Sequence, residues 1–293
     1  CEEKNSNSYG DVEDINSLHI LKDSSVIINL AAMHRDDIKP ITRYDDVNVG
    51  GARNICDSAR EHDIDKIVFT SSVAIYGFAP LGTDEGGEPN YFNDYGRTKY
   101  EAELIYKAWF DEDPKNRTLV IIRPTVIFGE GNRGNVFNLL NQINNKKFLM
   151  IGSGKNYKSM AYVENVAAFI EYSLNFEKGM HTYNYIDKPD FNMNDLIRII
   201  RKKLFDKDSV GFRVPLSLGL LVGYLADLIA IILRRSLPIS SIRVKKFISN
   251  TMFSTSLDKT GFIPPVTLKE GLQRTLKYEF LENNSNKKTF YSE

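Results

Sequence analysis

The chain has 293 residues with 38 basic and 38 acidic side chains, so its formal net charge is zero and bulk charge gives no reason to expect a nucleic-acid partner. A hydrophobic fraction of 42% is ordinary for a globular protein, and the length suits one large domain or two modest ones. The two cysteines and four scattered histidines offer neither a disulfide framework nor metal-ligand spacing, which fits a cytoplasmic protein without a metal site.

The first part of the chain alternates strand-like and helix-like segments. Apolar runs at 25–32, 66–71 and 119–122 predict buried strands, and residues 47–62 and 95–110 predict the helices between them. Continuous apolar strands that alternate with helices are typical of a parallel sheet covered on both faces. We therefore expect an α/β fold with a Rossmann-like doubly wound parallel sheet. Ligands of such sheets bind at the carboxyl ends of the strands.

Beyond about residue 130 the alternation becomes less regular. Helices are predicted there at 135–144, 163–174, 192–204 and 267–282. Short extended segments are predicted at 148–151 and 183–186. This part is expected to be smaller and to interleave with the sheet.

The segment 216–233 is strongly apolar and is followed by Arg234 and Arg235. It is barely long enough to span a bilayer, and it contains Asp227 and two glycines. These features favour a helix that is buried or faces a partner. Weak association with a membrane surface is the alternative.

The most informative pattern is Tyr95 followed four residues later by Lys99, at the start of a predicted helix. Residues at this spacing share a helix face, and a nearby ammonium is expected to lower the tyrosine pKa from about 10. Ser72 follows a predicted strand and is able to hydrogen-bond the same substrate oxygen. In isolation the Tyr–Lys spacing is more often a solvated helix face. The order of strand, serine-rich turn and helix instead favours a proton shuttle that interconverts an alcohol and a ketone beside a hydride carrier.

A glycine-rich turn is missing from the start of the chain. Dinucleotide sites usually begin with a strand, such a turn and a helix, whose glycines admit the pyrophosphate. Here the chain starts at Cys1 within a polar stretch that runs to Ser8. We expect a further strand–helix–strand of about 30 to 45 residues upstream in the native protein, with natural loss of cofactor binding as the alternative. The chain as it stands is expected to bind dinucleotide poorly.

These motifs resemble the extended short-chain dehydrogenase/reductase family, in its NAD-dependent epimerase/dehydratase branch that acts on nucleotide sugars. The segments that carry the resemblance are 10–14, 29–32, 47–54, 70–77, 95–99 and 123–125. The resemblance implies a dinucleotide-binding part at residues 1–130 with later segments returning to it, a mainly substrate-binding part at 131–285, and a frayed tail at 286–293. It also implies NAD as cofactor, with NADP open, and a homodimer.

The resemblance further implies roles for individual residues. Ser72, Tyr95 and Lys99 would be catalytic. The residues expected to contact the cofactor are Asp11, Val12, Leu30, Ala31, Ala32, Asn48, Tyr95, Lys99, Pro124 and Thr125. Those expected to contact a nucleotide-diphosphate sugar are Ser72, Asn135, Lys158 and Arg243.

Two departures from the family pattern narrow the reaction. Sugar 4,6-dehydratases of this family carry an acid and a base where this chain has Val73 and Ala74, which cannot transfer protons. Lys158 stands where many members have arginine, so it would meet a phosphate as a point charge. The leading interpretation is a nucleotide-sugar 4-epimerase of polysaccharide or O-antigen precursor synthesis. A 4-ketoreductase, a hydroxysteroid or other small-alcohol dehydrogenase, and a non-catalytic dinucleotide sensor remain as alternatives.

Overall fold

The computed structural model describes residues 9–35, 38–233, 235, 240–284, 286 and 288–290. A parallel sheet forms the first part of the fold. Its strands occur in the order β1 (Ile27–Asn29), β2 (Lys66–Thr70), β3 (Thr118–Pro124) and β7 (Gly179–Tyr185). All three neighbouring pairs are parallel, so their carboxyl ends share one edge. The predicted α/β fold with a parallel sheet is confirmed.

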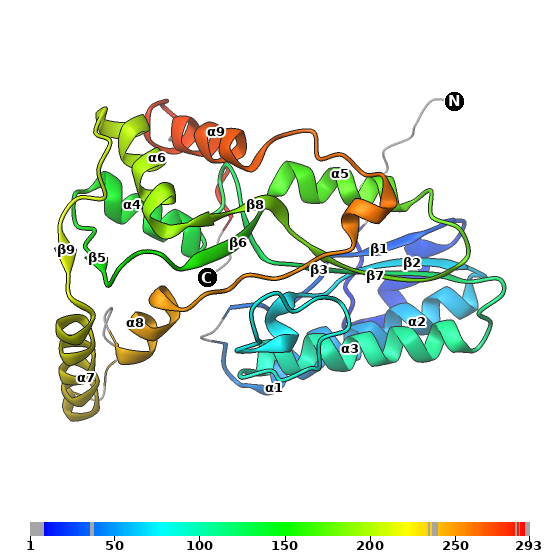
Figure 1. The fold of residues 1–293 in the computed structure, drawn as a ribbon. Helices are drawn as coiled ribbons and strands as arrows, with labels where there is room; N and C mark the ends of the chain where they lie inside the picture. Colours follow the sequence, from blue (N-terminus) through cyan, green and yellow to red (C-terminus); the bar gives the residue numbers. More distant parts are fainter. Residues whose placement is uncertain are drawn as a thin grey trace.

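Helices cover both faces of this sheet (Figure 1). The helices α2 (Gly51–Glu61) and α3 (Asp94–Asp111) lie on one face, and α5 (Val163–Ser173) lies on the other. Each face has its own hydrophobic cluster, and every residue of β3 is buried. Double coverage explains why these strands read as continuous apolar runs.

The approach to α2 is longer than the sequence pattern indicates. A short helix α1 (Thr42–Tyr44) and a π-helical turn η2 (Asp45–Gly50) run directly into it. A 3-10 segment η1 (Ile15–Leu21) packs beside α2 and adds Leu18 to the core. The predicted helix at 47–62 therefore begins about one and a half turns early.

A second, smaller part contains another hydrophobic cluster. Its sheet consists of β4 (Val126–Phe128), β6 (Tyr157–Tyr162) and β8 (Asp187–Asn192). The other elements of this part are α4 (Asn135–Asn144), α6 (Met193–Phe205), α9 (Leu268–Phe280), the strand pair β5 (Met150–Ile151) and β9 (Arg213–Val214), and α8 (Ser241–Ile248). The 3-10 turn η4 (Leu257–Thr260) instead packs against β7, and Leu257 belongs to a cluster of the parallel sheet. The sequence pattern missed β6, β8 and α8, because β8 is polar and contains Pro189 while β6 mixes polar and apolar residues.

Two results concern the division of the chain. The boundary near residue 130 stays a prediction, although the second sheet begins at β4. The frayed tail at 286–293 also stays a prediction; within it the backbone of Phe290 pairs with Gly131 and Arg133 through bonds of 2.9 and 2.7 Å.

The apolar segment forms α7 (Leu216–Leu233), a helix long and apolar enough to cross a membrane by length and composition alone. Only Gly219 and Gly223 of this helix are buried. The buried alternative was therefore wrong, because the apolar side chains point away from the body while the two glycines face it. A helix that faces a partner or a membrane surface stays a prediction. Figure 1 shows α7 at the lower left, at the far end from the parallel sheet.

Candidate functional site

The serine and the tyrosine of the predicted site meet at the carboxyl edge of the parallel sheet. Ser72 follows β2 and caps the 3-10 turn η3 (Val73–Tyr76), where its hydroxyl accepts from the Ala74 amide at 3.1 Å. Tyr95 lies in the first turn of α3, close enough to Ser72 for the serine hydroxyl to lower the pKa of the phenol. A β-carbon on Gly96 would lie 2.5 Å from the Ala74 carbonyl oxygen, so glycine is what lets the helix approach this turn.

The electrostatics of the pair differ from the sequence-based expectation. Burial raises the pKa of Tyr95 above its usual value, and the hydrogen bond from Ser72 offsets only part of this. Lys99 is buried with its ammonium 4.5 Å from the centroid of the Phe69 ring, and burial lowers its own pKa to about 7. Burial is the larger of the two causes at Tyr95, and the lowering of its pKa by Lys99 stays a prediction.

Asn48 fastens the loop after β1 to the start of α3. Its side chain accepts from the Met33 amide at 2.8 Å and donates to the Met33 carbonyl oxygen and to the Thr98 hydroxyl. Thr98 in turn donates to the Asp94 carbonyl oxygen at 2.9 Å. These bonds hold the loop that carries Ala31 in a fixed position relative to the first turn of α3, which carries Tyr95.

A buried polar network lies beneath the site. Arg123, at the end of β3, pairs with Glu103 of α3 through two bonds of 2.8 and 2.6 Å. Glu103 also accepts from the Ser71 hydroxyl at 2.6 Å, and Arg123 donates to the Tyr76 hydroxyl at 2.6 Å. Tyr76 then donates to Asn184. The network joins α3, β3 and β7 to both ends of the turn that contains Ser72.

Sequence reasoning missed this network, although one signal was available. Glu103 follows Lys99 by four residues, as Lys99 follows Tyr95, so all three lie on one face of α3. A carboxylate on the buried face of a helix requires a cation, and Arg123 provides it. Arg123 lies in the segment 123–125 that carries the family resemblance, but no partner for its charge was predicted from the sequence.

The other predicted cofactor residues occupy the same end of the fold. Leu30, Ala31 and Ala32 follow β1, with Leu30 and Ala31 exposed. Pro124 ends β3 and Thr125 follows it, and both are buried. The Thr125 amide and hydroxyl both donate to the Tyr185 carbonyl oxygen.

Asp11 and Val12 lie in the loop before η1. The carboxylate of Asp11 accepts from the Glu13 amide, and Asn54 of α2 donates to the Val12 carbonyl oxygen at 2.8 Å. A β-carbon on Gly51 would lie 2.9 Å from the Val12 side chain, so this glycine sets how closely the loop approaches α2.

The predicted substrate residues are dispersed. Asn135 is exposed at the start of α4, and Arg243 is exposed in the first turn of α8. Lys158 of β6 donates instead to the carbonyl oxygens of Lys246 and Ser249 at 2.9 and 2.7 Å, and burial lowers its pKa to about 8. Lys158 therefore tethers the end of α8 in this structure, and its contact with a substrate phosphate stays a prediction.

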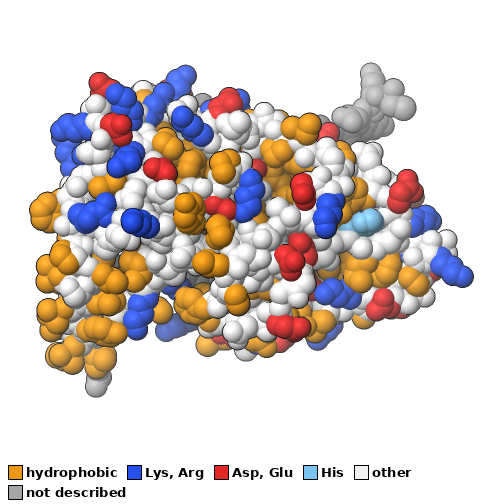
Figure 2. Space-filling model, in the orientation of Figure 1, with side chains coloured by type: hydrophobic (Ala, Val, Ile, Leu, Met, Phe, Trp, Pro, Cys, Tyr) orange, Lys and Arg blue, Asp and Glu red, His pale blue; other side chains and the backbone are white. Residues whose placement is uncertain are grey.

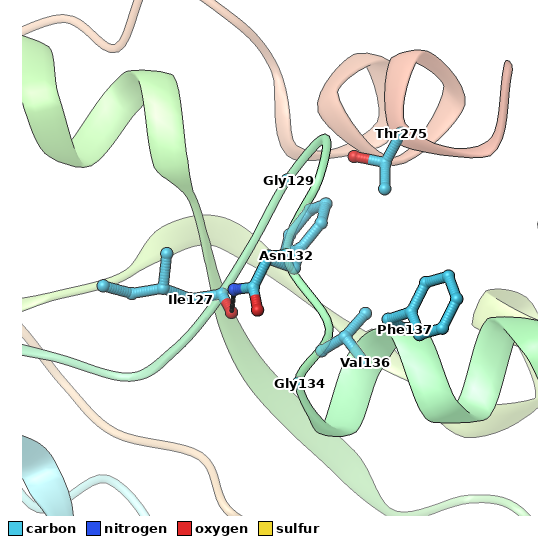
Figure 3. A pocket seen from close by; sticks show the side chains of 8 residues that line it. Ile127, Gly129, Asn132, Gly134, Val136, Phe137 and Thr275 are labelled. Carbon is cyan, nitrogen blue, oxygen red and sulfur yellow. Dashed lines mark hydrogen bonds between the residues drawn. The ribbon is translucent and has the colours of Figure 1, made fainter. Parts of the chain in front are cut away.

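Two hollows lie away from the serine–tyrosine pair. One is a cavity of about 10 Å³ between the 127–137 loop and α9, which has room for about one water molecule (Figure 3). In it the Asn132 side chain donates to the Ile127 carbonyl oxygen at 3.3 Å. The other, of about 440 Å³, lies between α5 and Phe262. Neither is lined by Ser72, Tyr95 or Lys99.

A parallel sheet with serine, tyrosine and lysine at its carboxyl edge defines the class as a dinucleotide-dependent α/β enzyme. Residues 2–185 match the model of the NAD dependent epimerase/dehydratase family. The chain belongs to this family, and NAD is its cofactor.

Two curated relatives extend the match over most of the chain. An N-acetyl-alpha-D-glucosaminyl-diphospho-ditrans,octacis-undecaprenol 4-epimerase from Escherichia coli O157:H7 is 46% identical over 97% of this chain and 86% of the relative. A UDP-glucose 4-epimerase from Vibrio cholerae is 27% identical over 90% of this chain and 79% of the relative.

The solved structure of a UDP-N-acetylglucosamine 4-epimerase from Methanobrevibacter ruminantium M1, in complex with UDP-N-acetylmuramic acid, shares the fold. It superimposes with a TM-score of 0.70 at 22% identity and covers 92% of this chain and 80% of that chain. The predicted Rossmann fold and family are confirmed.

Proposed function

We propose that this enzyme inverts carbon 4 of an N-acetylated hexosamine held on a diphosphate, using Ser72, Tyr95 and Lys99 with bound NAD. The observation that carries the proposal is the 46% identity to a 4-epimerase over nearly the whole chain, combined with the placement of Ser72 and Tyr95 together at the sheet edge. Val73 and Ala74 agree with it, because they lack the acid and base that dehydration requires.

The residues present fit a dinucleotide at this edge. The Thr70 hydroxyl at the end of β2 is buried without a partner in the described part of the chain. The buried Lys99 ammonium faces only the Phe69 ring in the contacts described, which leaves donors for a ribose. Leu30, Ala31, Pro124 and Thr125 would line the same edge, and Asn48 would hold its loop. NAD bound there supplies reversible acceptance of the carbon-4 hydride.

Proton transfer falls to the protein. Tyr95 takes the proton of the carbon-4 hydroxyl and returns it to the ketone oxygen after the sugar has turned its other face. Ser72, which contacts the Tyr95 hydroxyl, orients that oxygen and relays the proton. Because burial raises the pKa of Tyr95, the phenol holds its proton more tightly before substrate and cofactor bind. A protonated Lys99 beside a bound ribose would then favour the phenolate.

The carrier of the sugar is the more specific part of the proposal. The relative from Escherichia coli O157:H7 acts, by its name, on a sugar diphosphate linked to undecaprenol, whereas the one from Vibrio cholerae acts on UDP-glucose. The higher identity of the first favours a polyprenyl carrier, and the second favours a nucleotide carrier. Both share the diphosphate, so Arg243 and Asn135 stay proposed contacts to it. A homodimer on the cytoplasmic side of the membrane also remains part of the proposal.

The decisive experiment is a substrate comparison. The full-length protein with NAD is incubated separately with polyprenyl-diphosphate N-acetylglucosamine in detergent and with UDP-N-acetylglucosamine, and the released sugars are separated by chromatography. We expect the carbon-4 epimer from the lipid-linked sugar, at least tenfold faster than from UDP-N-acetylglucosamine. A faster reaction with UDP-N-acetylglucosamine would overturn the carrier, and net formation of reduced cofactor without an epimer would overturn the reaction.

A further inference from the structure

The helix α7 exposes an apolar surface that no part of the described chain covers. Ile231 and Ile232 are 74% and 70% exposed, and the apolar side chains around them are exposed as well. Figure 2 shows this surface as a continuous hydrophobic patch at the lower left, over α7. We call it the α7 patch, and its most outward members are Leu221, Leu225, Leu228, Ile229, Ile231 and Ile232. Patches of this kind mark contact with a protein or a membrane.

One side of α7 is fixed to the body. A β-carbon on Gly219 would lie 2.6 Å from Ile151, and one on Gly223 would lie 2.9 Å from the backbone of Ser241. Further along, the Asp227 carboxylate accepts from the Ser241 amide at 3.1 Å. The start of α8 therefore returns to the middle of α7.

This return excludes a spanning helix. At 1.5 Å per residue α7 is about 27 Å long, close to the roughly 30 Å of a bilayer core. A crossing would place Ser241 and Asp227 near the bilayer centre, although Lys158 ties the other end of α8 to β6. A helix anchored along one side fits a bilayer surface, where its outward side enters the acyl region.

The charge around the α7 patch favours a lipid surface over a second copy of this chain as its partner. Residues 213–249 contain six cations and one acid, a net charge of +5, whereas the whole chain is neutral. The ammonium of Lys245 lies 5.4 Å from the centroid of the Tyr224 ring, so a cation and an amphipathic aromatic border the patch together. Anionic headgroups attract such a rim, and aromatic residues of this kind favour the bilayer interface. A second copy would bring the same positive charge and repel it.

The patch also adjoins the site. The ammonium of Lys246 in α8 lies 4.7 Å from the centroid of the Phe92 ring, and Phe92 precedes Tyr95 by three residues. Phe92 stacks on Phe78, and both rings are about half exposed. A membrane-bound α7 thus places the loop before α3 near the headgroups.

We propose that α7 is a monotopic membrane-docking helix that inserts its outward side into an anionic bilayer and holds the Tyr95 site at the headgroup level. The docking itself does not depend on the substrate. Its use, which rests on the proposed function, is to bring a lipid-held sugar diphosphate to Tyr95 while the lipid tail stays in the membrane.

The test measures vesicle binding without any sugar. The full-length protein is sedimented with vesicles of phosphatidylcholine and phosphatidylglycerol at 7:3 and with pure phosphatidylcholine vesicles. The double variant Leu228→Glu/Ile232→Glu changes two exposed side chains on one helix face. Its matched control, Ile263→Glu/Leu281→Glu, adds the same charge at two exposed apolar sites outside the patch.

We expect the α7 variant to lower the partition coefficient at least tenfold and the control to change it less than twofold. Pure phosphatidylcholine should bind the unaltered protein several-fold more weakly. Equal binding by the α7 variant would overturn the proposal. So would a change from dimer to monomer in light scattering with vesicle binding intact, because α7 would then be a protein interface. Since no sugar is present, failure here leaves the 4-epimerase proposal standing, and the converse also holds.

Discussion

The helices α3 and α7 are both 18 residues long, yet their composition and their burial run in opposite directions. α3 is rich in charge and buries Thr98, Lys99 and Glu103 against the sheet, whereas α7 is almost wholly apolar and buries only two glycines. In an ordinary globular protein the apolar helix would be inside and the charged helix outside. Buried charges on α3 and exposed apolar side chains on α7 each cost stability unless another interaction compensates the cost. For α3 the compensation is the partner network beneath it, and for α7 we assign it to the membrane.

The contrast also separates two uses of a helix. α3 holds reacting groups in fixed positions relative to β2 and β3, and this positioning requires a dense set of internal hydrogen bonds. Among the described residues, the side chains of α7 make few hydrogen bonds to the rest of the protein, and its exposed side chains face the surroundings. We therefore predict the effects of substitutions at residues on which the function of each helix depends.

The largest effect is expected from Tyr95→Phe, which removes one oxygen from α3. Turnover should fall about a hundredfold to ten-thousandfold, because general acid–base catalysis contributes roughly 10²–10⁴ and Tyr95 is the proposed proton carrier. The Tm should stay within about two degrees. Epimer formation and thermal unfolding are measured on one preparation, with Tyr91→Phe, an exposed tyrosine nearby, as control. Undiminished turnover would remove Tyr95 from the mechanism.

The next effect concerns the network itself. Arg123→Met leaves the buried Glu103 carboxylate without its bidentate partner and should cost about 3–5 kcal/mol of stability in urea unfolding. Arg274→Met, which breaks an exposed ion pair on α9, is the control and should have little effect. The double variant Arg123→Met/Glu103→Gln should recover part of the loss. If it is no more stable than Arg123→Met, the two charges are not coupled.

A third prediction uses the pH dependence of Lys99. Its pKa falls from about 10.5 in the unfolded chain to about 7 in the folded one, because of burial. The unfolded state thus binds the extra proton between these values, so stability should rise with pH across this window. The cost of burying the ammonium is complete below pH 7 and vanishes near pH 10.5.

Lys99→Met should therefore raise the Tm by roughly 2–6 °C at pH 6.5, and by less at pH 9, while turnover is lost. Tm is recorded at pH 6.5, 8 and 9, with Lys115→Met, an exposed lysine in the turn after α3, as control. A Tm difference that grows with pH would contradict the assigned shift.

The sequence predicted α3 far better than it predicted its surroundings. The Tyr–Lys spacing, the serine after β2 and the apolar strands depend on local periodicity, which a single sequence contains. The Glu103–Arg123 pair joins residues 20 positions apart, and Asn184 meets Tyr76 across 108 positions. Such partners are set by the order of strands in the sheet, which the periodicity does not specify.

α7 illustrates the opposite difficulty. Its bounds were predicted well, but its environment was not, because an apolar run reads alike in a core, an interface and a bilayer. The environment of Lys158 was missed for a related reason. A lysine near a predicted phosphate site and a lysine that holds helix carbonyl oxygens have the same local sequence, and only the fold of α8 onto β6 distinguishes them.

Lys158 also provides the smallest predicted effect and a link between the two regions. Lys158→Met removes two hydrogen bonds that hold the end of α8, and should cost about 1 kcal/mol of stability. Because α8 packs on α7 through Ser241, the loosened tether should weaken vesicle binding about twofold while turnover in detergent changes less than threefold. Lys155→Met, in the exposed loop before β6, is the control. A hundredfold loss of turnover in detergent with normal vesicle binding would instead return Lys158 to the substrate phosphate, since a diphosphate contact acts whether or not a bilayer is present.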